Sequence, residues 1–533
     1  MYWTTNKMIN KEILSFCLKK GILLDKEVLE LFSNYPDLES AKFFIEKIKE
    51  VSSVNVLTKH TFIENITHFN KAVEFLPEER KKKLEKLKIN LGLSIEIIKE
   101  ISEPNIQESK IIEEKNDSVR VISNYLSPSK KLTVSDFVTH FRNRFNSLKN
   151  ILQENSSLTN LTSISKISPE RKVFSLIGLI SSKKVSKNKN LLLEIEDLTG
   201  KITVLINKDK KDLFSLAEDL PLDSVIGFKG TISKGTSNKN IFFVNEIILP
   251  ESSLSLRKKS PIEEFALFIG DIHIGSKLFL EKNFLKFIDY LNGKVPNTPE
   301  VSKIKYLFIV GDLIAGVANY PGQEKELSLS DLESHFQKAA ELLSKIRSDI
   351  KIIISTGNHD GVRIMEPQPL INEKYAWPLY NLKNISFVTN PSLINFGFSN
   401  SFSGFNILLY HGFSFFYYAD NIPSLIKQKS AHRPELIMDY LLKYRHLAPT
   451  HSSTQYYPSE KDSLLIQEVP DIFISGHTHK SGVMYHNNIL IISVSSWESM
   501  TGYQEKRGAE PDFCKVPIFN LKTGSIKILD FEQ

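Results

Sequence analysis

A chain of 533 residues is longer than one hydrophobic core usually supports, which predicts several domains. Its hydrophobic content of 41% and charged content of 24% are typical of soluble globular proteins. With 68 Lys and Arg against 62 Asp and Glu, the net charge of +6 is compatible with a nucleic-acid partner but does not require one. Two cysteines, Cys17 and Cys514, are too few for a disulfide framework or a thiolate zinc site and indicate a reducing, cytoplasmic setting. We expect neither a secretory signal nor a membrane-spanning segment.

The N-terminal part of the chain has the pattern of helices. In stretches such as NKEILSFCLKKGILL, apolar residues recur every three or four positions between charged ones. We therefore assign residues 1–101 to an N-terminal helical domain. Residues 102–130 are polar, charged and almost free of aromatic residues, which predicts a linker.

A helix and then a small barrel are expected next. Residues 131–167 contain a helix that would place Phe137, Phe141 and Phe145 on one core-facing side, an interpretation that outweighs contact of these rings with nucleic acid. Residues 168–252 are short β-rich segments separated by glycine- and asparagine-containing turns. Their number fits a five-stranded barrel, and the oligonucleotide/oligosaccharide-binding (OB) fold is the obvious candidate. OB modules also serve as docking platforms, so the barrel does not establish nucleic-acid binding.

Residues 253–533 alternate apolar strands with helices, which makes the whole chain a multidomain α+β protein. Five of these strands stop at the polar clusters GDIH, GD, GNHD, HG and GHTH. The clusters supply Asp271, His273, Asp312, Asn358, His359, Asp360, His411, His477 and His479. One such residue after a strand is usually a turn former, but chance is a poor explanation for five clusters. Asp-x-His and His-x-His put two side chains on the same side of an extended segment, and these groups suit Mn²⁺, Fe²⁺ or Zn²⁺.

This set of motifs resembles the calcineurin-like metallophosphoesterase superfamily from Phe265 to about Phe519. The resemblance implies a β-sandwich flanked by helices and two divalent ions, with Mn²⁺ expected and Fe²⁺ or Zn²⁺ as alternatives. Its first ion would be held by Asp271, His273, Asp312 and His479, and its second by Asp312, Asn358, His411 and His477. His359 would contact the scissile phosphate and Asp360 would orient His359. Two such ions lower the pKa of a bridging water and align the attacking and leaving oxygens.

An OB-like module directly before a phosphoesterase resembles the small subunits of replicative DNA polymerases, and the archaeal D family in particular. LLKYRHLAPTH and SVSSWESMTGYQEKRGAEPDF carry this resemblance, which runs from about Thr133 to the C-terminus. It implies a 3′→5′ exonuclease that proofreads single-stranded or mismatched 3′ ends. The implied partners are DNA, a large catalytic polymerase subunit in a heterodimer and, through the holoenzyme, a sliding clamp. Eukaryotic small subunits have lost metal ligands, whereas this chain retains them.

Four further residues are candidates for DNA contacts. Arg363 and Arg445 are placed where they could bind backbone phosphates, and Trp497 and Tyr503 could stack on a frayed 3′ base. Ordinary structural roles are the alternative for each. Two other functions stay open, namely a scaffold subunit with a dormant nuclease site and an Mre11-like repair nuclease. About 260 residues precede the phosphoesterase, which counts against the Mre11-like interpretation.

Overall fold

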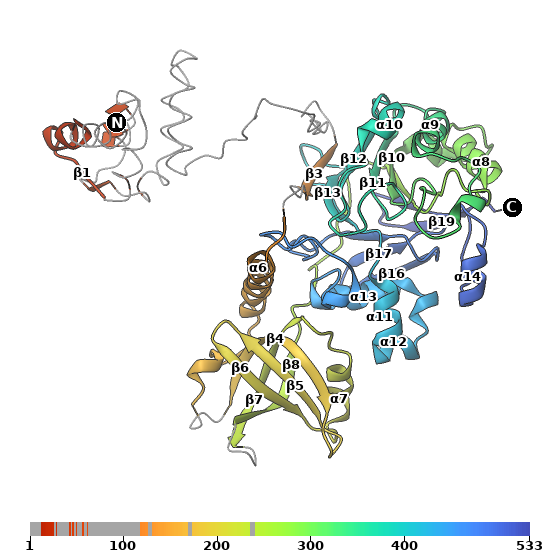
Figure 1. Ribbon diagram of the computed structural model, residues 1–533. Helices are drawn as coiled ribbons and strands as arrows, with labels where there is room; N and C mark the ends of the chain where they lie inside the picture. Colours follow the sequence, from red (N-terminus) through yellow and green to blue (C-terminus); the bar gives the residue numbers. More distant parts are fainter. Residues whose placement is uncertain are drawn as a thin grey trace. The chain divides into compact units, whose positions relative to one another are not determined.

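The computed structural model (Figure 1) describes residues 12–25, isolated positions between 28 and 61, and residues 118–125, 131–168, 173–234 and 240–532. The chain divides into two compact units, Met1–Ile106 and Gln107–Gln533. In the first unit, β1 (Leu23–Leu24) pairs in parallel with β2 (Val56–Leu57). Most of the helical domain predicted over residues 1–101 lies outside the described residues.

A closed barrel of five strands in the order β4-β5-β6-β8-β7 opens the second unit's central part. Its elements are β4 (Phe174–Val185), β5 (Leu191–Asp197), β6 (Gly200–Ile206), α7 (Lys211–Glu218), β7 (Val225–Lys234) and β8 (Asn240–Ile248). Along β5, Leu191, Leu193 and Ile195 are buried while the residues between them are not, as expected for strands with one face toward the barrel interior. The predicted five-stranded barrel is confirmed.

Two six-stranded sheets form a sandwich in the C-terminal part (Figure 1). The first sheet has the order β12 (Ile385–Val388), β11 (Lys351–Ser355), β10 (Ile304–Val310), β9 (Phe265–Ile269), β18 (Lys515–Asn520), β19 (Ile526–Asp530). The second has the order β16 (Gly482–His486), β17 (Ile489–Ser493), β15 (Ile472–Ser475), β14 (Phe405–Leu409), β13 (Ser392–Phe396), β3 (Val119–Asn124). Strands β9 to β12 run parallel, and so do β14, β15 and β17.

Helices cover both outer faces of the sandwich. Helices α8 (Glu281–Leu291), α9 (Leu332–Leu343) and α10 (Glu373–Tyr380) pack on the first sheet, and α11 (Phe415–Asn421), α12 (Pro423–Lys427) and α13 (Pro434–Tyr444) on the second. A separate apolar core, which includes Phe268, Phe308 and Ile474, fills the space between the sheets. The central strands are therefore apolar on both faces, which explains continuous runs such as FALFI in β9.

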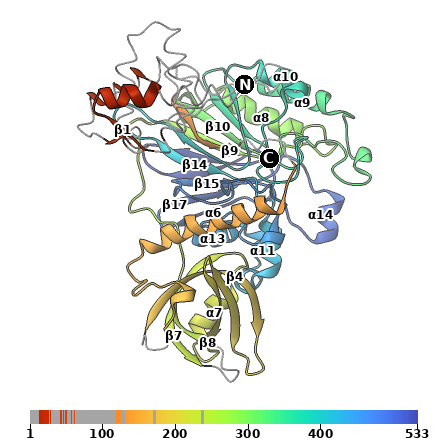
Figure 2. The same ribbon diagram turned by 60° about the vertical axis from the view of Figure 1, so that its left-hand side comes forward.

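Helix α6 (Val134–Gln153) lies between the barrel and the sandwich (Figure 2). Phe145 and Leu148 are buried, as predicted for a core-facing helix, and belong to an apolar cluster with barrel residues such as Ile177. On the sandwich side, Arg144 Nε donates to Asp462 Oδ2 at 2.6 Å. The helix thus joins the two domains by both apolar and charged contacts.

Part of the predicted linker is a strand. Residues 119–124 form β3, which pairs antiparallel with β13, and Val119 is buried in the core of the sandwich. Val119, Val121 and Ser123 alternate toward one face, a strand pattern that the polar residues around it obscured. The linker prediction is therefore wrong for residues 119–124, whereas residues 102–117 and 126–130 lie outside the described part of the chain.

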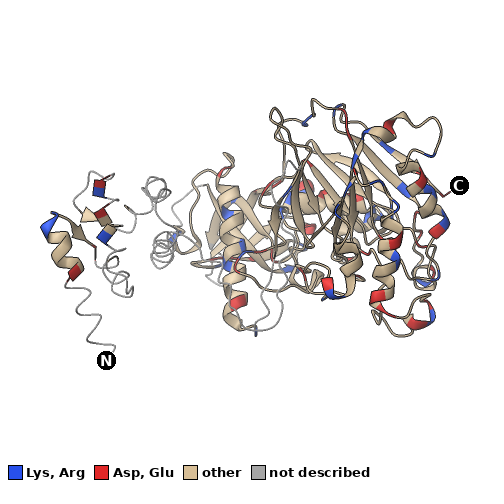
Figure 3. Cartoon of the chain, turned by 90° about the horizontal axis from the view of Figure 1, so that it is seen from above, with Lys and Arg blue, Asp and Glu red and all other residues tan. Residues whose placement is uncertain are grey.

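Charged residues of both signs lie side by side along the helices, in keeping with the nearly balanced composition (Figure 3). Among the described residues, the helices are all too short or too polar to cross a lipid bilayer. The fold thus presents a mixed surface, and the concentration of function has to be sought in its edges and clefts.

Candidate metal centre

The polar clusters that follow the strands meet at one edge of the sandwich. The predicted ligands follow β9, β10, β11, β14 and β15 in that order: Asp271 and His273; Asp312; Asn358; His411; His477 and His479. Strands β9, β10 and β11 are parallel neighbours in one sheet, and β14 and β15 are parallel neighbours in the other. Their carboxyl ends therefore bring the seven side chains to a single place.

The first group of close ligand atoms comes from Asp271, His273 and His479. His273 Nε2 lies 3.1 Å from His479 Nε2, which in turn lies 3.5 Å from Asp271 Oδ1. Two imidazole lone pairs repel at this distance unless a cation or a proton lies between them. This set of nitrogen and oxygen donors fits a divalent transition-metal ion.

Asp312 belongs to more than one group of ligand atoms. It clusters with His273 and His359, and separately with His411 and His477. Asp312 Oδ2 lies 3.2 Å from His411 Nε2 and 4.0 Å from His273 Nε2. A carboxylate that reaches both groups has the placement of a ligand that bridges two ions.

The ring of His411 is set by the backbone of β10. Its Nδ1 lies 2.9 Å from the carbonyl oxygen of Val310, a contact that requires a hydrogen on Nδ1. In the neutral ring the lone pair is then on Nε2, which lies 3.1 Å from Asn358 Oδ1. Two acceptors that face each other need a cation between them, so the backbone selects the tautomer suited to metal binding.

The backbone is left-handed at five of the seven predicted ligands. The φ angles are 48° at Asp271, 54° at His273, 49° at Asp312, 66° at His477 and 56° at His479. Such angles cost about 1–3 kcal/mol for a residue with a Cβ atom. Close packing leaves the chain little choice, because a Cβ on Gly357 would lie 2.2 Å from Asp312 Oδ1. Strain concentrated at one edge is a sign of function that is independent of the motifs.

Burial and mutual charge shift several pKa values at this edge. Burial alone would raise the pKa of Asp312, but the charges of His411 and His359 outweigh it and hold this pKa well below its usual range. Burial, with a contribution from the charge of Asp312, raises the pKa of Asp360 to about 7. The site thus gathers carboxylates whose repulsion a bound cation would relieve.

His359 is oriented by a loop and not by Asp360. The carbonyl oxygen of Ala315 accepts from His359 Nδ1 at 2.8 Å and from Asn319 Nδ2 at 3.0 Å. Asp360 instead accepts hydrogen bonds from backbone N–H groups of two neighbouring turns, at 3.1 and 2.8 Å. The predicted role of Asp360 is therefore corrected: it stabilises the backbone around His359. Asn319 was missed because its loop carries no motif.

The two aromatic candidates for DNA contact differ completely in exposure. Trp497 has no exposed surface, and its ring packs edge-on to Phe284 with centroids 5.0 Å apart. Its backbone N–H donates to the carbonyl oxygen of Asp271 at 3.0 Å, so it supports the site from inside the core. A buried ring cannot stack on a base, which corrects the prediction for Trp497. Tyr503 is 64% exposed on α14 (Gly502–Arg507).

The two predicted arginines use their guanidinium groups within the protein. Arg445 is 7% exposed, and its Nε donates to the carbonyl oxygen of Ile466 at 2.7 Å. Arg363 is half-buried, and its Nη2 donates to the carbonyl oxygen of Pro367 at 2.7 Å. Both side chains therefore stabilise loops, and in this conformation Arg445 is not accessible to DNA.

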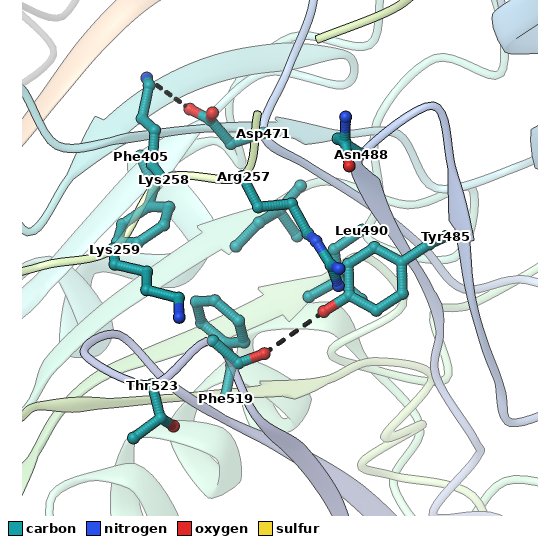
Figure 4. A pocket seen from close by; sticks show the side chains of 12 residues that line it. Arg257, Lys258, Lys259, Phe405, Asp471, Tyr485, Asn488, Leu490, Phe519 and Thr523 are labelled. Atoms are coloured by element: carbon teal, nitrogen blue, oxygen red, sulfur yellow. Dashed lines mark hydrogen bonds and ion pairs between the residues drawn. The ribbon is translucent and has the colours of Figure 1, made fainter. Parts of the chain in front are cut away.

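A second concave region, a cavity of about 190 Å³, lies at the other ends of the same strands (Figure 4). It is lined by the first residues of β14 and β15 and by the basic segment 257–259, which leads from the barrel into the sandwich. Lys258 Nζ donates to Asp471 Oδ2 at 2.7 Å, and the Arg257 guanidinium lies 4.6 Å above the ring of Tyr485. These contacts fix the basic segment to the sandwich.

Comparison with known proteins agrees with this domain order. Residues 266–483 match the family of B-type subunits of DNA polymerases alpha and epsilon, and residues 174–250 match the family described as OB-fold nucleic acid binding domain. The DNA polymerase II small subunit of Methanothermobacter thermautotrophicus is 36% identical over 402 residues, which are 75% of this chain and 80% of that protein. The chain belongs to the DNA polymerase II small subunit family.

Other members of this family come from the genus Pyrococcus. The small subunit of Pyrococcus furiosus is 37% identical over 410 residues, or 75% of this chain and 64% of that protein. The one from Pyrococcus horikoshii is 34% identical over 477 residues, or 86% of this chain and 73% of that protein. The chain thus spans less than two thirds of the length of the Pyrococcus furiosus protein. The predicted membership in the archaeal D-family small subunits is confirmed.

Proposed function

We propose that this chain is a metal-dependent 3′→5′ exodeoxyribonuclease within a DNA polymerase, and that its sandwich is a calcineurin-like phosphoesterase domain. The observation that carries the proposal is the position of Asp312, which lies between two groups of nitrogen and oxygen ligands. One shared carboxylate between two such groups suits a pair of divalent ions, with Mn²⁺ as the first choice and Fe²⁺ or Zn²⁺ as alternatives. The left-handed backbone at five ligands supports a catalytic role over a purely structural one.

The chain's own residues account for the rest of the chemistry. Two bound ions would supply a water of lowered pKa and neutralise charge on the attacking and leaving oxygens. His359 donates its Nδ1–H to Ala315, which directs Nε2 into the site, 4.0 Å from Asp312 Oδ2. When protonated, this Nε2 can donate a hydrogen bond to the scissile phosphate or a proton to the leaving oxygen.

Substrate and partner follow from the family. The relatives are named as small subunits of DNA polymerase II, which supports a large catalytic subunit as the partner in a heterodimer. We propose single-stranded or frayed 3′ ends of DNA as the substrate, because an OB-fold barrel precedes the metal centre. Tyr503, exposed on α14, is the aromatic residue that we retain as a base contact. The sliding clamp stays a prediction.

The test uses the purified chain with Mn²⁺ and single-stranded DNA labelled at its 5′ end, with and without the large subunit. We expect a ladder that shortens from the 3′ end and that disappears in Asp312→Ala and His359→Ala. His432→Ala, which changes a histidine outside the cluster, is the matched control and should cut normally.

Each other outcome selects a different function. Cleavage at internal positions alone would favour an Mre11-like nuclease over a proofreading enzyme. If the wild-type chain binds Mn²⁺ but cuts no DNA even beside the large subunit, the dormant scaffold is the correct interpretation.

A further inference from the structure

The last predicted ligand, His479, is contacted from behind by the short helix α14. Gln504 Nε2 lies 2.8 Å from His479 Nδ1. The same amide offers its Oε1 to the backbone N–H of Thr501 at 3.0 Å, while Thr501 Oγ1 accepts from the Gln504 N–H at 3.3 Å. The two Thr501 contacts form a capping box at the start of α14. One glutamine amide therefore serves both a candidate metal ligand and a helix cap.

These two duties conflict once His479 binds a cation through Nε2. A neutral imidazole has a single N–H, so a ring that gives the Nε2 lone pair to a cation must carry its hydrogen on Nδ1. That Nδ1–H needs an acceptor, yet the amide of Gln504 presents an N–H group to it. Turning the amide would supply Oε1 to His479 but would bring the NH₂ group against the Thr501 N–H. A glutamine has one acceptor oxygen, and two donors then compete for it.

No other described group relieves this competition. Among the described residues, Gln504 is the hydrogen-bond partner of His479 Nδ1, and Nε2 faces Asp271 and His273. The backbone of His479 is fixed separately, since its carbonyl oxygen accepts from the Asp512 N–H at 2.8 Å. The ring cannot escape the conflict by a shift of the chain.

We propose that Gln504 is a positioning residue that couples metal occupancy at His479 to the N-terminal cap of α14. Without a cation, the amide completes the capping box. With a cation, it turns, its Oε1 accepts from His479 Nδ1–H, and the first turn of α14 loses one cap hydrogen bond. Met500 and Tyr503, 42% and 64% exposed, flank Thr501, so loading the centre loosens the surface where a DNA end would rest. The inference rests on the proposed metal centre.

Two substitutions of Gln504 separate the two duties. Gln504→Glu has two acceptor oxygens and can serve Thr501 and His479 at once, so it should bind Mn²⁺ at least as tightly as the wild type. Gln504→Leu has a similar size and no acceptor, so Mn²⁺ affinity at the first site should fall about 10- to 100-fold. Isothermal titration of the metal-free full chain with Mn²⁺ measures both. Gln428→Leu, at an exposed glutamine after α12, is the control and should titrate like the wild type.

Hydrogen exchange tests the coupling without any substitution. We expect Mn²⁺ to speed amide exchange in residues 501–508 of the wild-type chain while it slows exchange at the strand ends that carry the ligands. In Gln504→Glu the effect on residues 501–508 should vanish. Unchanged exchange in residues 501–508 of the wild type on addition of Mn²⁺, or wild-type Mn²⁺ affinity in Gln504→Leu, would overturn the coupling.

The same measurements keep this inference distinct from the proposed function. A wild-type chain that binds no Mn²⁺, or an Asp312→Ala variant that binds it normally, contradicts the metal centre itself and the coupling with it. A chain that binds Mn²⁺ through Asp312 but ignores Gln504 contradicts the coupling alone.

Discussion

The two edges of the sandwich are built from the same strands and carry opposite chemistry. At the edge where β9, β10 and β15 end, imidazole and carboxylate atoms lie 3–4 Å apart with no basic side chain between them. At the edge where β14 and β15 begin, the charged residues are basic, and Lys258 is paired with Asp471. One edge leaves its ligand atoms unmatched, whereas the other matches its charges. Unmatched ligand atoms, more than charge as such, mark the functional edge.

Removing the shared carboxylate should have the largest effect. Asp312→Ala takes away the oxygen that lies closest to both ligand groups. We expect loss of Mn²⁺ binding at one or both positions and a fall in exonuclease rate of about 1,000-fold or more, because the activated water depends on the ions. Titration with Mn²⁺ and a single-turnover assay on 5′-labelled DNA measure the two effects. Near-normal binding and cleavage would mean that the two edges do not differ as described.

His359→Ala should separate chemistry from metal binding. His359 is half-buried and lies 4.0 Å from Asp312 Oδ2, beyond a direct bond to that carboxylate. The variant should lose about 100- to 10,000-fold in rate, the usual range for a group that transfers a proton in the transition state. Its Mn²⁺ affinity should stay within a few-fold of the wild type. A variant that loses metal and rate together would make His359 a ligand.

Local sequence was enough to locate the functional edge. Each ligand follows an apolar run, and parallel neighbours necessarily deliver their carboxyl ends to one side of a sheet. The barrel was also visible, because its alternation and turn residues are local signals. The strand β3 was missed for the opposite reason, since its six residues lie between polar stretches and its partner β13 follows about 270 residues later.

The fine structure of the site could not be predicted from the sequence. The tautomer of His411 depends on a carbonyl oxygen of Val310, and the ring of His359 depends on one of Ala315. Backbone atoms carry no residue-type signal, so contacts of this kind leave no motif. Trp497 was misassigned because an aromatic residue beside a site has the same letter whether it packs or stacks. Only its burial distinguishes the two roles.

A buried carboxylate near the functional edge should make stability depend on pH. Glu366 is fully buried, accepts from Tyr410 OH at 3.1 Å, and its pKa is raised by burial from 4.5 to about 7. A carboxyl with a raised pKa stabilises the fold fully below its unfolded value, and this contribution is lost as the pH rises through about 7. Glu366→Gln should therefore gain up to about 3 kcal/mol over the wild type between pH 5 and 8. Urea unfolding at both pH values measures it, and equal pH dependence in the two proteins would contradict it.

The smallest effect on activity is expected at the opposite edge. Lys258→Met removes the cation from Asp471, a residue with 7% of its surface exposed, and should lower the free energy of unfolding by about 1–2 kcal/mol. The loss is limited because the backbone N–H of Asn406 still donates to the same carboxylate oxygen at 2.7 Å. Lys259→Met is the matched control in the same cavity, since Lys259 forms no ion pair with any described residue, and it should stay within about 0.5 kcal/mol. Both variants should keep wild-type Mn²⁺ affinity and exonuclease rate. A rate that falls tenfold in Lys258→Met with the fold intact would show that the paired edge acts on the unpaired one through the strands they share.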